Sequence, residues 1–232
     1  MTNSFINNTD VSEYSLLKRS EEKRHLEVFY LELTARCNNN CRHCYINLPQ
    51  NHKISRAKEL SLTRIKKIID QAVSLGALRC VLTGGEPLLR KDLPEVLDLF
   101  YGNFVIGLPT NAIKVAPDLA RILEDKIDFA NIGLDGPRNV TTRQRGSYDK
   151  ILKGVYLLKR FNIPISLSCV VLSSTVDSVL LTCQIADLLE AKKLKLILPI
   201  SKGNALDLPA EEYLEIKESE ILFENVRKAK EK

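Results

Sequence analysis

The sequence alternates short apolar runs, rich in β-branched residues, with longer segments whose apolar residues recur at helical spacing. The short runs predict strands at residues 28–34, 79–83, 104–108, 129–134, 165–172 and 194–200. The segments between them predict helices at residues 59–75, 93–100, 117–123, 148–161 and 176–189. Strands and helices that alternate in this way form right-handed crossovers, so we expect a parallel sheet.

The length of the chain limits how such a sheet can close. A complete eight-unit barrel typically needs about 250 residues, whereas this chain has 232 residues and lacks two of the strands. A doubly wound open sheet is the alternative architecture. We predict an α/β fold built as a partial (β/α)6 barrel of the TIM type, with parallel strands inside and helices outside.

The pattern divides the chain into three parts. Residues 1–26 form a polar lead-in, residues 27–207 form the partial barrel, and residues 208–232 form a charged amphipathic helix that we expect to cap the sheet edge. The 34 Lys and Arg residues against 29 Asp and Glu residues give a net charge of +5, spread along the chain. This balance argues against a dedicated nucleic-acid binder.

Neither a membrane span nor a signal peptide is expected. The sequence has no apolar run long enough to cross a bilayer, and its N-terminal segment is polar. We therefore expect a cytoplasmic protein without a membrane partner. In a reducing compartment the six cysteines do not form a disulfide framework, which leaves packing, redox chemistry or metal binding to explain them.

Chemically distinctive residues stand at or directly after the ends of four predicted strands. The segments are TARCNNNCRHCY after the first strand, GGEP after the second, PTNA after the third and DGPR after the fourth. The carboxyl ends of parallel strands meet at one edge of the sheet. We therefore expect these four segments to build a single site.

Three cysteines in the first of these segments are the strongest metal-binding candidates. Cys37, Cys41 and Cys44 lie within eight residues, and thiolates select zinc or iron–sulfur centres. Closed zinc sites and ordinary four-iron clusters use four protein ligands. Three thiolates leave a coordination position open, which indicates a catalytic centre.

Two alternatives for the three cysteines remain open. They could be reduced thiols without a metal, or they could hold zinc with a histidine as the fourth ligand, for which the candidates are His25, His43 and His52. The remaining cysteines lie inside predicted strands or on a predicted helix, where a free cysteine is usually a small core residue. They are Cys80, Cys169 and Cys183.

The GGEP segment is the second candidate. Gly84 and Gly85 would let a ligand approach the backbone closely, and Pro87 would end the strand's hydrogen-bond ladder. Glu86 would offer a carboxylate to a cationic group. Taken alone, the segment could also be a simple turn.

These motifs together resemble those of the radical S-adenosylmethionine superfamily. CNNNCRHC is similar to its CxxxCxxC signature and TGGEPLLRKDL to its GGEP motif, while LPTNA and NIGLDG are similar to its TNG-type and SLDG strand ends. The likeness covers about residues 28–210. HCY and LDG look most like the maturase-type, SPASM-associated branch, whose members modify peptides or proteins. That branch usually continues into a cysteine-rich extension, whereas this sequence has no cysteine after Cys183.

The resemblance implies two cofactors, a 4Fe-4S cluster and S-adenosylmethionine. Cys37, Cys41 and Cys44 would each bind one iron, and the fourth iron would bind the amino and carboxylate groups of S-adenosylmethionine. One-electron reduction would cleave the sulfonium to a 5'-deoxyadenosyl radical, which abstracts hydrogen from the substrate. The implied partners are a flavodoxin- or ferredoxin-like electron donor and, as a candidate substrate or partner, a peptide or protein.

The resemblance also implies which residues bind S-adenosylmethionine. The segment from Gly84 through Glu86 would bind the methionine amino group, and His43 stands where the family usually has an aromatic residue that shields the cluster or touches adenine. The family's HDxxRG segment reads NVTTRQRGSYD here, so either of two arginines could reach the methionine carboxylate. The full set of candidate cofactor-binding residues is Gly84, Gly85, Glu86, Pro87, Thr110, Asn111, Asp135, Arg143, Arg145 and His43.

Two other hypotheses come from different classes. A non-catalytic or truncated paralogue would bind a cluster or cofactor and act with a partner. A zinc-binding structural module is the third hypothesis, which the missing fourth ligand disfavours.

Overall fold

The computed structural model describes residues 26–46 and 59–231. Most of the predicted lead-in, and both His25 and His52, lie outside the described residues. Within them one six-stranded sheet is formed by β1 (Val28–Thr34), β2 (Arg79–Gly84), β3 (Val105–Thr110), β4 (Phe129–Gly133), β5 (Ile165–Val170) and β6 (Leu194–Ile197).

All neighbouring strands pair in parallel, and their order in space follows their order in the chain. A doubly wound sheet would reverse this order at a switch point. The sheet has no such reversal, so the predicted partial barrel with parallel strands and outer helices is confirmed.

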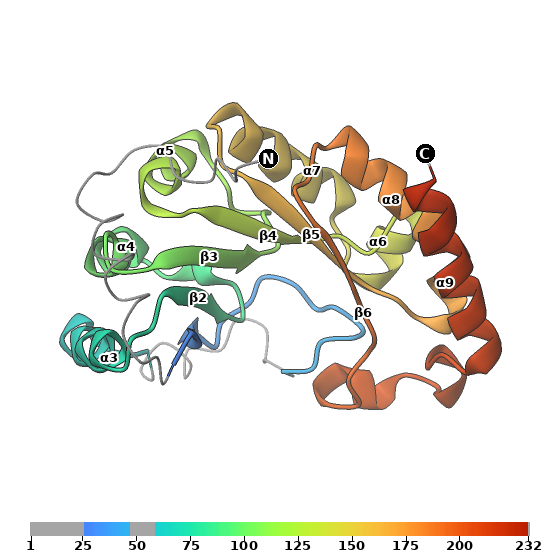
Figure 1. The fold of residues 1–232 in the computed structure, drawn as a ribbon, viewed down its shortest axis with the longest axis horizontal. Coiled ribbons are helices and arrows are strands. Elements are labelled where there is room, and N and C mark those ends of the chain that lie inside the picture. The colour runs from blue at the N-terminus through green and yellow to red at the C-terminus, as the bar shows by residue number, and fades with distance from the viewer. Residues whose placement is uncertain (1–25, 47–58, 232) are drawn as a thin grey trace.

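The helices form an outer arc around the sheet, while the loop after β1, drawn in blue, lies on the inner side (Figure 1). The helices are α3 (Leu62–Ser74), α4 (Leu93–Phe100), α5 (Pro117–Lys126), α6 (Arg138–Gln144), α7 (Tyr148–Arg160), α8 (Val179–Leu188) and α9 (Ile216–Lys230). Short 3-10 turns are η1 (Pro87–Leu89), η2 (Ser173–Ser178), η3 (Gly203–Asp207) and η4 (Ala210–Glu212).

Local signals explain where several helices begin. The Ser61 side chain accepts a hydrogen bond from the Arg64 backbone N–H and so caps α3. Pro117 is the first residue of α5, where its missing N–H costs nothing. The predicted helix at 176–189 starts instead as η2 and becomes α-helical at Val179, and the predicted strand at 194–200 ends at Ile197.

Helix α6 was not predicted. Its sequence, RNVTTRQ, has no apolar residues at helical spacing, so periodicity gives no signal. The helix follows Pro137, and the Thr141 hydroxyl donates a hydrogen bond of 2.7 Å to the Gly136 carbonyl. Tertiary burial of Val140, Thr141 and Gln144 holds this turn in place.

The main core lies between the sheet and the helices outside it. Leu82, Ile106 and Ile132 contribute from the strands, and Ile65 and Leu97 contribute from the helices. Cys80 and Cys169 are buried within β2 and β5, which agrees with the prediction that they are small core residues.

The C-terminal helix covers a second, smaller apolar cluster. Ile221, Leu222 and Val226 of α9 pack there with Val176 and Val179, and the cluster also includes Cys183 and the β6 residues Leu194 and Leu196. Helix α9 therefore lies against α8 beside the edge strand (Figure 1). No helix in the described ranges has the length and apolar character needed to cross a membrane.

Candidate cofactor site

Three cysteines surround one pocket at the carboxyl ends of the strands. Cys37, Cys41 and Cys44 are unpaired and half-buried in the loop after β1. The rest of the lining comes from Asn39, Asn40, Ile46, Gly85 and Asn204. The first two motif segments of the sequence therefore meet here, as the parallel fold predicts.

The donor set fits an iron–sulfur cluster better than a zinc ion. Among the described residues no three His, Cys, Asp or Glu side chains converge closely enough to hold one metal ion. Zinc needs its sulfur ligands about 2.3 Å from a single point, whereas the thiolates of a cluster bind separate irons and stand farther apart. Three cysteines around one pocket match the second arrangement.

Burial favours the protonated form of Cys37 and Cys41. It raises the pKa of the Cys37 thiol to about 11. Burial also raises the pKa of Cys41, which the neighbouring Arg145 opposes. Only thiolates bind metal, so formation of a cluster must displace protons from these thiols.

The glycines at the end of β2 bring two strand ends together. Gly84 has φ +135°, and a Cβ atom on it would stand 2.3 Å from the Thr34 carbonyl oxygen. Gly85 donates its backbone N–H to the same oxygen at 2.8 Å, and the Glu86 N–H bonds the Arg36 carbonyl at 2.8 Å. The absence of a side chain at Gly84 therefore lets the GGEP segment lie directly beside the cysteine loop.

Glu86 is buried and hydrogen-bonded within the protein. Its buried carboxylate accepts hydrogen bonds from the Thr110 hydroxyl at 2.7 Å, the Asn111 backbone N–H at 2.7 Å and the Leu88 backbone N–H at 3.1 Å. Both oxygens therefore accept hydrogen bonds from the protein itself. Burial raises its pKa to about 7. Glu86 joins the end of β2 to the end of β3, and Pro87 begins the turn η1.

Asn111 connects the third strand end to the cysteine loop. Its side-chain amide donates a hydrogen bond of 2.8 Å to the Asn38 side-chain oxygen. Thr110 stands beside it, buried, with its hydroxyl on Glu86. The PTNA segment therefore lies at the same site as GGEP and the cysteines.

Of the two candidate arginines, only Arg145 lies at the cysteines. Its Nη1 is 3.9 Å from Cys41 Sγ, and its guanidinium pairs with the buried carboxylate of Asp135. Arg143 is exposed and reaches Ser174 instead. His43 is buried with its Nε2 3.6 Å from Asp135 Oδ2, and burial lowers its pKa to about 4, so its ring is neutral at pH 7.

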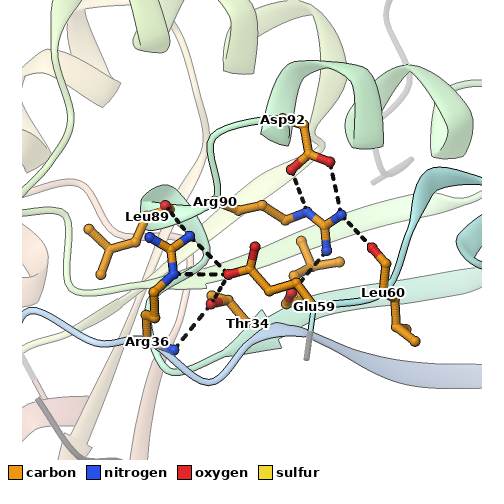
Figure 2. A network of polar contacts seen from close by, with 8 residues as sticks. Thr34, Arg36, Glu59, Leu60, Leu89, Arg90 and Asp92 are labelled. Carbon is orange, nitrogen blue, oxygen red and sulfur yellow. Dashed lines mark hydrogen bonds and ion pairs between the residues drawn. The ribbon is translucent and has the colours of Figure 1, made fainter. Parts of the chain in front are cut away.

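Two arginines that the sequence analysis did not single out fix the end of β1 and the start of the cysteine loop (Figure 2). Arg36, directly before Cys37, pairs with Glu59 at 2.9 Å and donates to the Leu89 carbonyl at 2.7 Å. Arg90 is buried and donates to the Leu33 and Leu60 carbonyls and to Asp92. In the sequence, Arg36 can be noticed only because it stands next to Cys37. Its position does not reveal that its partner is Glu59.

Asn204, in η3 after β6, was also missed. Its backbone N–H bonds the Cys44 carbonyl at 2.8 Å, and its side-chain amide donates to the Cys41 carbonyl at 3.0 Å. Asn204 therefore attaches the last strand connection to the cysteine loop. Its separation of 163 positions from Cys41 leaves no local sequence signal.

Residues 31–183 match the family model of the Radical SAM superfamily. The chain belongs to this superfamily. It is an enzyme of the radical SAM type, and enzymes of this family use a 4Fe-4S cluster and S-adenosylmethionine. The three cysteines, the GGEP segment and the PTNA and LDG strand ends lie within the matched residues.

The relatives by sequence include cofactor-biosynthesis enzymes. Fe-coproporphyrin III synthase of Methanosarcina barkeri is 30% identical over 77% of this chain and 44% of its own length. Molybdenum cofactor biosynthesis protein 1 of Dictyostelium discoideum is 31% identical over 74% of this chain and 28% of its own. A probable GTP 3',8-cyclase of Methanopyrus kandleri is 30% identical over 73% of this chain and 56% of its own. The chain matches between a quarter and little more than half of the length of these relatives.

Solved structures share the fold. The protein called native anSMEcpe with bound AdoMet superposes with a TM-score of 0.70 at 19% identity, covering 88% of this chain and 59% of that one. Streptococcus suis SuiB bound to the precursor peptide SuiA gives a TM-score of 0.69 at 12% identity, covering 99% of this chain and 55% of that one. At these identities the likeness concerns the fold.

The superfamily predicted from the motifs is therefore confirmed, but the maturase branch within it is not. The sequence relatives above carry the names of enzymes that make porphyrin and molybdenum cofactors rather than of peptide maturases.

Proposed function

We propose that this chain is a radical-generating core that abstracts hydrogen from a small precursor molecule in cofactor biosynthesis. The observation that carries the proposal is the set of three cysteines around one pocket, with the Gly85 backbone in the pocket wall. Three thiolates can bind three irons of a four-iron cluster and leave the fourth to S-adenosylmethionine.

Each part of the site has a role in this proposal. Cys37, Cys41 and Cys44 would hold the cluster, and the backbone of Gly85, which lines the pocket beside them, would bind the methionine end of S-adenosylmethionine. When bound, the cluster supplies the electron that cleaves the sulfonium to a 5'-deoxyadenosyl radical. The chain itself would bind and orient the two cofactors.

Side chains around the pocket fix this arrangement. Glu86 holds the strand ends that carry the glycines and Asn111 in register. The neutral His43 ring lies buried next to Cys44, where it can shield one side of the cluster from water. An electron donor of the flavodoxin or ferredoxin type would supply the electron from outside.

The proposal of a small precursor rests on the sequence relatives and on the strands of the barrel. The relatives' names refer to a GTP cyclase and to porphyrin synthesis. Asn131 on β4 is half-buried, and its side chain is hydrogen-bonded at 2.8 Å to Ser168 on β5, which is 8% exposed. These polar groups suit a polar substrate more than an apolar one.

Anaerobic reconstitution with iron and sulfide tests the core of the proposal. We expect the broad visible absorption of a 4Fe-4S cluster and, with dithionite and S-adenosylmethionine, formation of 5'-deoxyadenosine. Cys41→Ala should lose both, whereas Cys183→Ala, which replaces a cysteine outside the pocket, should keep both. Retention of either property in Cys41→Ala would contradict the assignment.

The same experiment separates the other two hypotheses. A cluster without 5'-deoxyadenosine would indicate a non-catalytic paralogue, and one zinc ion per chain would indicate a zinc module. Substrate class is tested by the rate of 5'-deoxyadenosine formation. We expect a small-molecule fraction of cell extract, or GTP as a defined probe, to raise this rate, and a peptide fraction to leave it unchanged.

A further inference from the structure

A buried ion pair at the end of β4 stands directly beside one of the three cysteines. Asp135 follows β4 and is fully buried, and Arg145 follows α6 with its side chain 14% exposed. Burying two charges is costly unless their geometry is well satisfied. The position of this pair next to Cys41 therefore needs an explanation.

The carboxylate holds the guanidinium at two points. Arg145 Nη2 donates to Asp135 Oδ1 at 2.9 Å, and Nε lies 2.7 Å from Oδ2. Asp135 Oδ1 also accepts the Val170 backbone N–H at 2.9 Å, which fixes the carboxylate to β5. The hydrogen bond from Nη2 and the ion pair at Nε together restrict the orientation of the guanidinium.

The third nitrogen points at sulfur. Arg145 Nη1 lies 3.9 Å from Cys41 Sγ, within the range of a hydrogen bond to sulfur. A Cβ atom on Gly133 would stand 2.6 Å from this same Nη1. The glycine at the end of β4 thus leaves the space in which the guanidinium reaches the cysteine.

We propose that Arg145, oriented by Asp135, is a positioning residue that donates a hydrogen bond to the Cys41 thiolate and raises the reduction potential of the bound cluster. This inference rests on the proposed function. Reduction adds one negative charge to the cluster, and a donor fixed at a ligand sulfur stabilises the reduced form more than the oxidised form. Hydrogen bonds to sulfur, local charge and burial are the means by which a protein sets such a potential.

The two arginines near this turn have different surroundings, which provides a control. Arg143 lies two residues earlier and is exposed, with only long contacts to Ser174. Removing the Arg143 side chain changes the charge of the same segment but removes no contact with a cysteine.

The test is the midpoint potential of the reconstituted cluster, measured by an anaerobic dithionite titration followed by electron paramagnetic resonance, without S-adenosylmethionine. We expect Arg145→Met to keep its cluster and to disfavour the reduced form about tenfold, a shift of about 59 mV to lower potential for one electron. Arg143→Met should keep the wild-type potential. Gly133→Ala retains the charge but displaces the guanidinium, and it should shift the potential in the same direction.

The outcomes are distinct. An unchanged potential in a cluster-loaded Arg145→Met protein would overturn the inference and leave a purely structural ion pair. If Arg145→Met does not fold, Gly133→Ala decides in its place, and an unchanged potential there overturns the inference. A wild-type protein that binds no 4Fe-4S cluster would overturn the proposed function itself, and this inference with it.

Discussion

At the scale of a single residue, Glu86 shows how burial changes the pKa of a carboxyl group. Its carboxylate is enclosed by protein donors, and burial raises its pKa from 4.5 to about 7. Between these values the native state keeps a proton that the unfolded state has lost. The stability contributed by this group is therefore complete below pH 4.5 and is lost as the pH rises through 7.

This difference predicts a pH dependence of the free energy of unfolding. In the cluster-free protein, Glu86 should lower that free energy by up to about 1.4 kcal/mol per pH unit between pH 4.5 and 7. Urea denaturation at several pH values, for wild type and Glu86→Gln, measures the effect. His43 titrates with the opposite sign, since its pKa is lowered to about 4, but it is present in both proteins. Parallel pH profiles for the two proteins would contradict the prediction.

At the scale of elements, α7 depends on a close approach to the loop after β3. Gly154, in the middle of this helix, is buried, and a Cβ atom on it would stand 2.0 Å from the Ala112 carbonyl oxygen. Ala112 follows Asn111 and has φ +58°. The helix therefore packs directly on the turn that presents Asn111 to the cysteine loop.

This packing reverses the usual effect of replacing a helical glycine. At an open helix position Gly→Ala stabilises by about 1 kcal/mol. Here we expect Gly154→Ala to lower the free energy of unfolding by about 1–3 kcal/mol, because the added methyl group overpacks the contact. Urea denaturation measures it, with Lys153→Ala at the neighbouring exposed position as a near-neutral control. A Gly154→Ala protein that is more stable than wild type would contradict the prediction, because it would show that there is room for a methyl group beside the Ala112 carbonyl.

The helices and strands also show which elements sequence periodicity can predict. The strands and the apolar helices were predicted because each one repeats a period that its own residues carry. Helix α6 carries no such period, and it exists because its turn is buried between the site and α7. Its last turn places Arg145, so the missed helix is the one that decides which arginine lies at the cysteines.

At the scale of the whole molecule, Asn204 links the last part of the barrel to the first loop. Its amide donates to the Cys41 carbonyl, and its backbone N–H bonds the Cys44 carbonyl. We expect Asn204→Ala to lower the free energy of unfolding by about 1 kcal/mol and to speed loss of the cluster to an iron chelator severalfold. Asn225→Ala is the matched control, because Asn225 also donates its amide to a backbone carbonyl, that of Val176, away from the pocket. Equal rates of iron loss in both variants would contradict the linking role.

Oxygen sensitivity is a further property of the molecule as a whole. The three cysteines are half-buried in a loop at the edge of an open sheet, and a cluster with an open iron site there would meet dissolved oxidants. We expect aerobic purification to give colourless protein without S-adenosylmethionine cleavage, and anaerobic purification to give coloured, active protein. Visible absorption and the yield of 5'-deoxyadenosine measure the difference. A stable coloured aerobic preparation would count against the proposed centre.

The sequence alone determined the parallel α/β fold and the superfamily, because strand and helix periods and the CxxxCxxC spacing are local properties of consecutive residues. It also predicted that the motifs meet at one edge, since parallel strands end together. Only the tertiary structure showed that Arg145 rather than Arg143 lies beside the cysteines, that the Glu86 carboxylate is bonded within the protein and that Asn204 reaches the cysteine loop. These outcomes depend on contacts between residues far apart in the chain, and such contacts exist only once the sheet has set the distances between its strand ends.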